Sequence, residues 1–209
     1  MANKINYQKE LEKIIQKHAQ TDTVPTLFLH SCCAPCSSYV LEYLSEYFSI
    51  TVFYYNPNIY PDTEYLHRVQ EQQNLISRMP LKHPVSFVEG DYEKEKFYEM
   101  ARGLENVKEG GERCFRCYEL RLRKTAALAS KGGFDYFATT LSISPLKNAE
   151  KLNEIGYRLS DEFQIPWLPS DFKKKNGYKR SIELSAEYHL YRQNYCGCVF
   201  SHSPSVSSI

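Results

Sequence analysis

Apolar residues recur along this chain with two different periods, and the alternation of the two predicts strands separated by helices. Short apolar runs rich in β-branched and aromatic residues, typical of buried strands, stand at 26–30, 50–56, 84–90 and 134–140. Helical patterns cover 1–20, 37–48, 62–78, 92–103 and 114–130. A further helix of roughly 15 residues is expected after the loop 141–148, and a final short strand at 164–169.

Strands that alternate with helices predict an α/β fold, with a mainly parallel, Rossmann-like sheet and helices on both faces. The length of 209 residues suits a single domain, which we expect to span 1–200, while the small polar residues of 201–209 indicate a disordered tail. Ligands in such sheets bind beyond the carboxyl ends of the strands, so the loops after the four runs should meet at one edge. Asn56, Asn58 and Asp91 lie in these loops, where turn and capping roles are their simpler interpretation.

The composition is that of a globular chain without a membrane segment. Hydrophobic residues make up 42% and charged residues 24%, and no apolar run approaches the roughly 20 residues of a membrane helix. The first 20 residues mix acids and bases along an apolar stripe of Ile5, Leu11, Ile14 and Ile15, which is not the layout of a secretory signal. We therefore expect a cytoplasmic protein with no membrane partner.

Seven cysteines are the most informative feature of the composition. Without a secretory signal they are expected to be reduced thiols, metal ligands or catalytic groups and not structural disulfides. They form three groups: Cys32, Cys33 and Cys36; Cys114 and Cys117; Cys196 and Cys198. His30, just ahead of the first group, is expected to be a satisfied structural histidine, although a hydrogen bond to a metal centre is its functional alternative.

Two pairs of these cysteines are candidate ligands of an iron–sulfur cluster. Cys114 and Cys117 stand at the start of a predicted helix, so their sulfurs share one face, and the free amides of the first turn favour thiolate over thiol. Cys32 and Cys33 are adjacent, so a turn can point them differently toward one polynuclear cluster. The four thiolates match the complement of a [4Fe–4S] cluster. A zinc site with four sulfurs is the alternative, because spacing alone does not separate the two metals.

Other combinations of the cysteines imply different chemistry. Cys33 and Cys36 frame a C-x-x-C motif between a strand and a helix, as in a thioredoxin-like thiol–disulfide oxidoreductase, although this interpretation leaves five cysteines without a role. Cys196 and Cys198 flank Gly197, which permits the tight ring of a strained, easily reduced disulfide. Both thiolates, with Cys36, could equally bind a further metal, and the residues favour neither interpretation.

Two basic segments and several aromatic residues are compatible with a nucleic-acid partner. Five bases lie at 172–180 and five at 113–124, and each set taken alone is more simply explained as a solvated surface. Most of the 17 tyrosines must pack in the core. Tyr188, Tyr191 and Tyr195, near the last cysteine pair, could instead stack on an extruded base.

Five segments, HSCCAPC, NPNIYP, GERCFRCYELRL, TTLSISPLKN and YRQNYCGCVFS, taken together and in order, resemble the epoxyqueuosine reductase QueH family. The resemblance spans nearly the whole chain after the first helix. It implies a [4Fe–4S] oxidoreductase that reduces the epoxide of epoxyqueuosine at the wobble position of tRNA to queuosine, the last step of queuosine biosynthesis. Its partners would then be that tRNA and an unidentified electron donor.

The same resemblance assigns roles to six of the cysteines. Cys32, Cys33, Cys114 and Cys117 match the cluster ligands of the family, and Cys196 and Cys198 match its redox-active pair. Some members carry an aspartate where this chain has Cys36, beside a second metal site. One additional iron near Cys36, Cys196 and Cys198 is therefore a further expectation.

Three classes of protein thus remain at the level of sequence. The first is an iron–sulfur reductase that modifies tRNA, the second is a thiol–disulfide oxidoreductase using Cys33 and Cys36, and the third is a zinc-stabilised nucleic-acid-binding module. The first predicts iron and sulfide in the protein, the second activity on disulfides without metal, and the third a fold that collapses under chelation.

Overall fold

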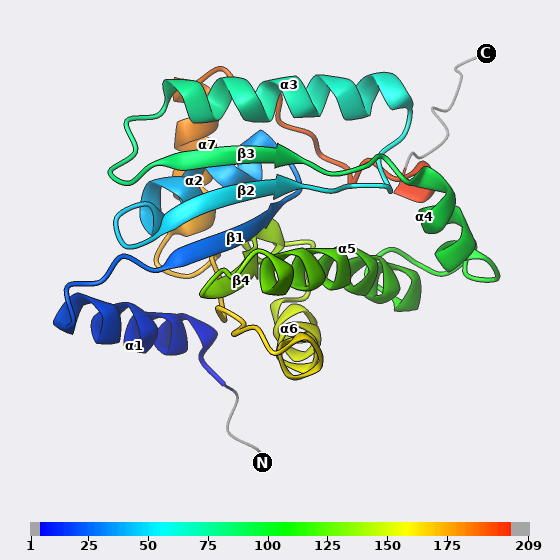
Figure 1. Ribbon diagram of the computed structural model, residues 1–209. Helices are drawn as coiled ribbons and strands as arrows, with labels where there is room; N and C mark the ends of the chain where they lie inside the picture. Colours follow the sequence, from blue (N-terminus) through cyan, green and yellow to red (C-terminus); the bar gives the residue numbers. More distant parts are fainter. Residues whose placement is uncertain (1–4, 202–209) are drawn as a thin grey trace.

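A computed structural model describes residues 5–201 and contains one four-stranded sheet in the order β3-β2-β1-β4 (Figure 1). The strands are β1 Thr26–Ser31, β2 Ser49–Tyr54, β3 Val85–Glu89 and β4 Tyr136–Thr139. Every neighbouring pair is parallel, so all four carboxyl ends lie at one edge. The α/β fold expected from the sequence is confirmed.

Seven α-helices and two short 3₁₀ helices connect and cover the strands within the described residues. The α-helices are α1 Tyr7–Gln20, α2 Ala34–Leu44, α3 Asp62–Arg78, α4 Lys94–Ala101, α5 Glu112–Lys131, α6 Ala149–Phe163 and α7 Gly177–Glu187. The 3₁₀ helices are η1 Thr140–Ile143 and η2 Val199–Ser201.

The two faces of the sheet are buried by different helices, as alternating strand residues require. Leu27 and Leu29 of β1 pack into one core with apolar residues of α1, α2 and α3. Phe28, between them, packs into a second core with residues of α5 and α6. Figure 1 accordingly shows α5 in front of the sheet, with α2 and α7 behind it. The prediction of helices on both faces is therefore confirmed.

Most predicted elements are present with shifted ends. The helix expected at 37–48 begins earlier, at Ala34, because Pro35 occupies the first turn, where proline needs no hydrogen-bond donor. Ile5 was expected in the buried stripe of the first helix, but it precedes the helix and is exposed. The helix at 62–78 is confirmed with its predicted ends, and Asp62 and Glu64 in its first turn suit the helix dipole.

Three features of the carboxyl-terminal half differ from expectation. The strand predicted at 164–169 is only an isolated bridge between Phe137 and Trp167. The expected loop 141–148 begins with η1. Helix α7 was not predicted, because its buried face consists of Gly177, Ser181, Leu184 and Ser185, and small polar residues give no apolar period.

Two further expectations were that the chain has no membrane helix and that its last residues form a disordered tail. No helix among residues 5–201 is long and apolar enough to span a bilayer. The tail predicted to be disordered lies outside the described residues except for Ser201, which ends η2.

Candidate functional site

A cavity of about 310 Å³ lies where the loops after β1, β2 and β4 meet. The β1 loop contributes Cys32, Cys33 and Cys36, and the segment after α7 contributes Cys196. The other residues that matter for its chemistry are Asn56, Asn58, Arg68, Arg121, Lys147, Tyr178, Ser181 and Tyr195. The predicted meeting of loops at the carboxyl edge is confirmed for three strands. The loop after β3 does not take part, because β3 is the far edge strand, and Asp91 projects into solvent.

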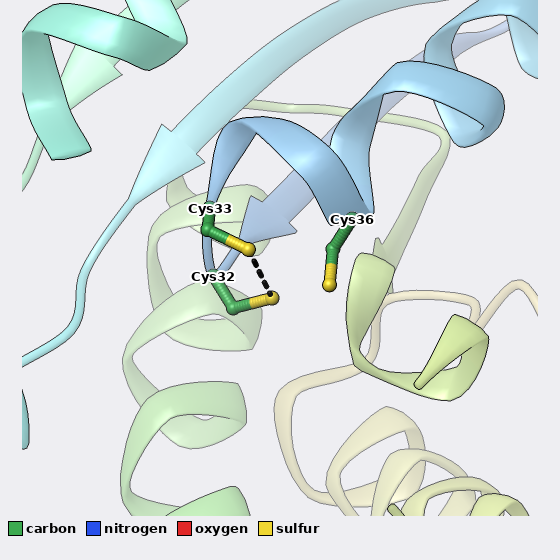
Figure 2. Close-up of side chains that lie close together, drawn as sticks. All are labelled: Cys32, Cys33 and Cys36. Carbon is green, nitrogen blue, oxygen red and sulfur yellow. Dashed lines mark hydrogen bonds between the residues drawn. The ribbon is translucent and has the colours of Figure 1, made fainter. Parts of the chain in front are cut away.

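Cys32, Cys33 and Cys36 form a compact group of sulfurs at the start of α2 (Figure 2). Their Sγ atoms lie within 4.8 Å of one another, and those of Cys32 and Cys33 are 3.8 Å apart. Extended backbone at Cys33 and the first helical turn at Cys36 turn the side chains toward a common point. The sequence allowed these adjacent residues to point differently toward one cluster, and in the structure the sulfurs of Cys32 and Cys33 both face one site. This spacing fits a single metal ion as well as part of a cluster.

Hydrogen bonds within this group favour the thiolate of Cys32 over those of Cys33 and Cys36. Hydrogen bonds from Cys33 and Cys36 hold the pKa of the Cys32 thiol well below its usual range. The same contacts with Cys32 raise the pKa values of Cys33 and Cys36. A thioredoxin-like motif would need its reactive thiolate within the Cys33–Cys36 pair. The favoured thiolate lies outside that pair, which counts against this alternative.

Cys114 and Cys117 lie on α5, which is present as predicted but starts at Glu112, ahead of the expected start at Cys114. Together with Cys196 and Cys198, these two cysteines line a small internal gap of about 10 Å³. Burial raises the pKa of the Cys117 thiol, so the expectation that the helix start favours its thiolate is wrong. Cys117 sits in the second turn of α5, beyond the free amides of the first, and desolvation of the charged form dominates there.

Cys196 connects the two groups, since it lines both the large cavity and the small gap. A hydrogen bond from Cys198, with the charges of Lys147 and Arg121, holds the pKa of the Cys196 thiol well below its usual range. No disulfide joins any two of the seven cysteines, all of which lie within residues 5–201. Gly197 has a φ of +94°, and a Cβ there would meet the Arg68 guanidinium at 2.9 Å, so only glycine fits between the last two cysteines.

Three buried cations face these thiols and were not identified from the sequence: Arg68, Arg121 and Lys147. Arg68 pairs with Glu64 at 2.7 Å, and Lys147 lies 3.5 Å from Glu109 and hydrogen-bonds to Cys196. Two of these cations, Arg121 and Lys147, could have been found from their positions relative to the cysteine and loop motifs. Arg121 follows Cys117 by one helical turn, and Lys147 closes the TTLSISPLKN segment.

Two of the polar candidates make their hydrogen bonds within the protein, and a third leaves a buried oxygen without a partner among the described residues. His30 is structural, as expected: Nε2 donates to the Tyr55 carbonyl at 3.1 Å and Nδ1 accepts from the Thr139 hydroxyl at 2.9 Å. Burial lowers the pKa of His30 to about 3, so the ring is neutral. Asn56 is also structural, since it donates to the Ser31 carbonyl at 2.8 Å. Asn58 is buried against the cavity, and its Oδ1 has no hydrogen-bond partner in the described part of the chain.

The aromatic candidates lie on two sides of the last segment. Tyr195 lines the cavity, and its hydroxyl bonds to Glu64 at 3.2 Å and to Tyr191 at 3.1 Å. Tyr188 packs against the core with α1 to α3 instead, as a structural tyrosine.

Most charges of the two basic segments are already paired within the chain. In 172–180, Lys173, Lys175 and Arg180 form ion pairs with Asp171, Glu12 and Glu42. Lys174 and Lys179 are the bases of this segment that make no ion pair with any residue the structure describes. In 113–124, the exposed bases pair with nearby glutamates on α4, α5 and α6 or at their ends. The structural interpretation of both runs is therefore the better supported one.

Comparisons with known proteins agree with the resemblance drawn from the motifs. A family model described as "Epoxyqueuosine reductase QueH" matches residues 27–204. The chain is 45% identical over 202 residues to a Staphylococcus epidermidis protein named epoxyqueuosine reductase QueH, covering 95% of this chain and 85% of that protein. Proteins of the same name from Streptococcus pyogenes (44% identity, 95% and 78% coverage) and Thermotoga maritima (34%, 84% and 90%) are also similar.

The match thus includes β1 to β4 and every cysteine of the chain, so it covers the cavity and both thiol groups. On this basis the chain belongs to the epoxyqueuosine reductase QueH family.

Proposed function

We propose that this protein reduces the epoxide of epoxyqueuosine in tRNA to the alkene of queuosine. The observation that supports this most directly is the cavity lined by Cys32, Cys33, Cys36 and Cys196 in a member of this family. A tRNA substrate would place the protein in the cytoplasm. The alternatives with Cys33 and Cys36 as a thioredoxin-like pair, or with structural zinc, have no comparable support.

The reaction requires reducing equivalents and a route for the oxygen. Two C–O bonds break and one C=C bond forms, while two electrons and two protons are consumed and the oxygen leaves as water. Cys196 and Cys198 as thiols hold two electrons and two protons, which they release when an S–S bond forms between them. An external electron donor must then reduce the disulfide to start another cycle.

The thiols and buried cations fit an anionic iron–sulfur centre. Thiolates are the ligands that select iron–sulfur clusters and zinc over harder ions, and the cations oppose the negative charge that four thiolates bring. Cys32, Cys33, Cys114 and Cys117 would hold the [4Fe–4S] cluster. Ligands of a cluster bind different irons, so they need not lie as close together as the three sulfurs at α2. When bound, such a cluster supplies electrons one at a time.

The position of Cys196 makes it the thiol of its pair that faces substrate. It lines the large cavity, whereas Cys198 lies only at the small gap behind. Lys147 hydrogen-bonds to Cys196, which keeps the sulfur oriented at the boundary between the two spaces. Cys36, close to Cys32 and Cys33, would be a ligand of one additional iron.

The cavity fits one base and not a helical stem. At about 310 Å³ it lies at the lower end of the range for small-ligand pockets, roughly 300–1,000 Å³. A base in an anticodon loop can leave its stack at low cost and enter such a pocket. Asn58 and Tyr195 would then contact the base, and Lys174 and Lys179 are the bases of 172–180 left to contact phosphate.

The first experiment is to purify the protein without oxygen, measure its iron and acid-labile sulfide, and assay tRNA that carries epoxyqueuosine. The proposal predicts about four irons and four sulfides per chain, or slightly more iron, and conversion to queuosine with a chemical reductant. Zinc in place of iron, or an iron-loaded protein that leaves the epoxide intact, would overturn it.

A further inference from the structure

Arg121 is a cation enclosed within the protein without a carboxylate. Its side chain is 2% exposed, and its location on α5 is one turn after Cys117. Nε donates to the Cys117 carbonyl at 3.1 Å, and Nη1 donates to Asn56 Oδ1 at a long 3.4 Å. Among residues 5–201 no acidic side chain forms an ion pair with it. Both acceptors are neutral, so the charge itself has no counterpart among the carboxylates.

The other arginines of α5 show what a satisfied guanidinium looks like in this fold. Arg113 is also buried, but it donates to three carbonyls at 2.6–2.8 Å and stacks on the Phe200 ring. Arg116 pairs with Glu112 at 3.0 Å. Arg123 pairs with Glu119 at 3.0 Å and with Glu162. Arg113 likewise has no carboxylate partner, so two other features set Arg121 apart on α5: it makes fewer hydrogen bonds, and it lines both spaces that contain the thiols.

What surrounds Arg121 is sulfur. It lines both the cavity with Cys32, Cys33 and Cys36 and the gap with Cys114, Cys117 and Cys198, and Cys196 belongs to both. The guanidinium thus lies between the two groups of cysteines.

A buried cation is costly to folding unless an anion compensates it, and the groups near Arg121 that can become anionic are the cysteine thiols. Resting on the function proposed above, we propose that Arg121 is the fixed counter-charge of the iron–sulfur centre, a positioning residue that lies between its two pairs of cysteine ligands. In the metal-free protein only the neighbouring thiols can compensate this charge, by losing protons, whereas in the loaded protein the cluster and its thiolate ligands would compensate it. Net charge near a cluster also sets its reduction potential, so the cation makes the centre easier to reduce.

The test compares Arg121→Met, Arg121→Gln and Arg121→Lys with the wild-type chain, both metal-free and after anaerobic loading with iron and sulfide. Arg123→Met, on the same helix but ion-paired at the surface, is the control. Three properties are measured: the urea midpoint of the metal-free protein, the rate at which a chelator removes iron, and the midpoint reduction potential of the cluster.

We expect the metal-free Arg121→Met protein to be at least as stable as wild type, because a methionine fills the space without a charge. Its cluster should be lost to the chelator roughly 10- to 100-fold faster, the range found when groups that support metal ligands are removed. The reduction potential should fall in Arg121→Met and Arg121→Gln but stay near the wild-type value in Arg121→Lys, which keeps the charge. Arg123→Met should leave cluster retention and potential unchanged.

If Arg121→Met does not fold, the cluster retention and reduction potential of Arg121→Gln are compared with those of Arg121→Lys. Both variants keep a hydrogen-bond donor, and only Arg121→Lys keeps the charge. A loaded Arg121→Gln protein with wild-type retention and potential overturns the inference while leaving the proposed function intact. A wild-type chain that binds no iron overturns the proposed cofactor and the inference together.

Discussion

Two asparagines separated by one residue differ in whether the protein already satisfies them. Asn56 bonds to the Ser31 carbonyl and to Arg121, whereas Asn58, equally buried, leaves its Oδ1 without a partner at the cavity wall. An unsatisfied buried amide oxygen costs about 1–3 kcal/mol. Such a group is retained where a ligand supplies the missing donor, and the N–H groups of a purine-like base would do so.

Replacing Asn58 with leucine should therefore affect substrate and not the fold. We expect Asn58→Leu to keep or raise the urea midpoint, while kcat/KM on epoxyqueuosine tRNA falls by roughly 5- to 150-fold, the equivalent of 1–3 kcal/mol. Asn56→Leu is the matched control and should lower stability, because two existing hydrogen bonds are lost. Equal loss of stability in both variants would contradict the assignment.

Substitutions of Cys36 and Cys114 distinguish two possible sets of metal ligands: the two cysteine pairs proposed above, and the three sulfurs at the start of α2. If Cys32, Cys33, Cys114 and Cys117 hold the cluster, Cys36→Ser should keep about four irons and four sulfides, with at most one further iron lost, and Cys114→Ser should lose the cluster. Iron and sulfide analysis with the visible spectrum measures both. The reverse pattern would assign the metal to the three sulfurs at the start of α2.

Cys196 should be dispensable for cofactor binding and necessary for turnover. Cys196→Ser removes the thiol that faces the cavity, and with it the two-electron capacity of the pair. We expect an unchanged visible spectrum and a loss of multiple turnover on tRNA. Full multiple turnover by this variant would show that the pair is not part of the redox cycle.

At the scale of elements, helix α7 connects the fold to the cavity. Tyr178 and Ser181 line the cavity, and Gly177 at the helix start lies directly against α2. A Cβ at Gly177 would come within 2.1 Å of the Phe172 carbonyl and 2.4 Å of the Tyr39 ring. Neither backbone nor a packed ring can yield that space, so the position of α7 depends on this glycine.

Gly177→Ala is thus expected to destabilise the protein by about 1–3 kcal/mol, the usual cost of overpacking. Because α7 would shift relative to the cavity, KM for tRNA should rise as well. Urea unfolding and steady-state kinetics measure the two effects. Lys179→Ala, at an exposed position of the same helix, should change stability little, and a similar loss there would remove the steric explanation.

At the scale of the whole molecule, the cores on the two sides of the sheet consist mainly of aliphatic and aromatic residues, and the cysteines lie at one edge. Removal of metal should therefore leave the fold in place. We expect the metal-free chain to keep its far-ultraviolet circular dichroism and a cooperative urea transition. Collapse of both on chelation would instead favour the zinc-stabilised module, whose folding depends on its metal.

Much of the architecture could be predicted because it depends on local pattern. The apolar runs of β1, β2, β3 and β4 and the helical periods of α3 and α5 are properties of neighbouring residues, and burial of both sheet faces requires them. Parallel pairing then brings the loops after β1, β2 and β4 to one edge. The three groups of cysteines could likewise be recognised from the sequence, because they are defined by spacing along the chain and not by positions in space.

What the sequence determined by itself is therefore the α/β fold, the edge that carries the site and the thiol chemistry, since these follow from periodicity and residue type. Only the tertiary structure decided that Cys36 joins Cys32 and Cys33, that Cys196 lies between two thiol groups, and that Arg121 is enclosed without a carboxylate. The physical reason is that desolvation and charge compensation depend on which residues distant in sequence become neighbours, and no local pattern encodes those distances.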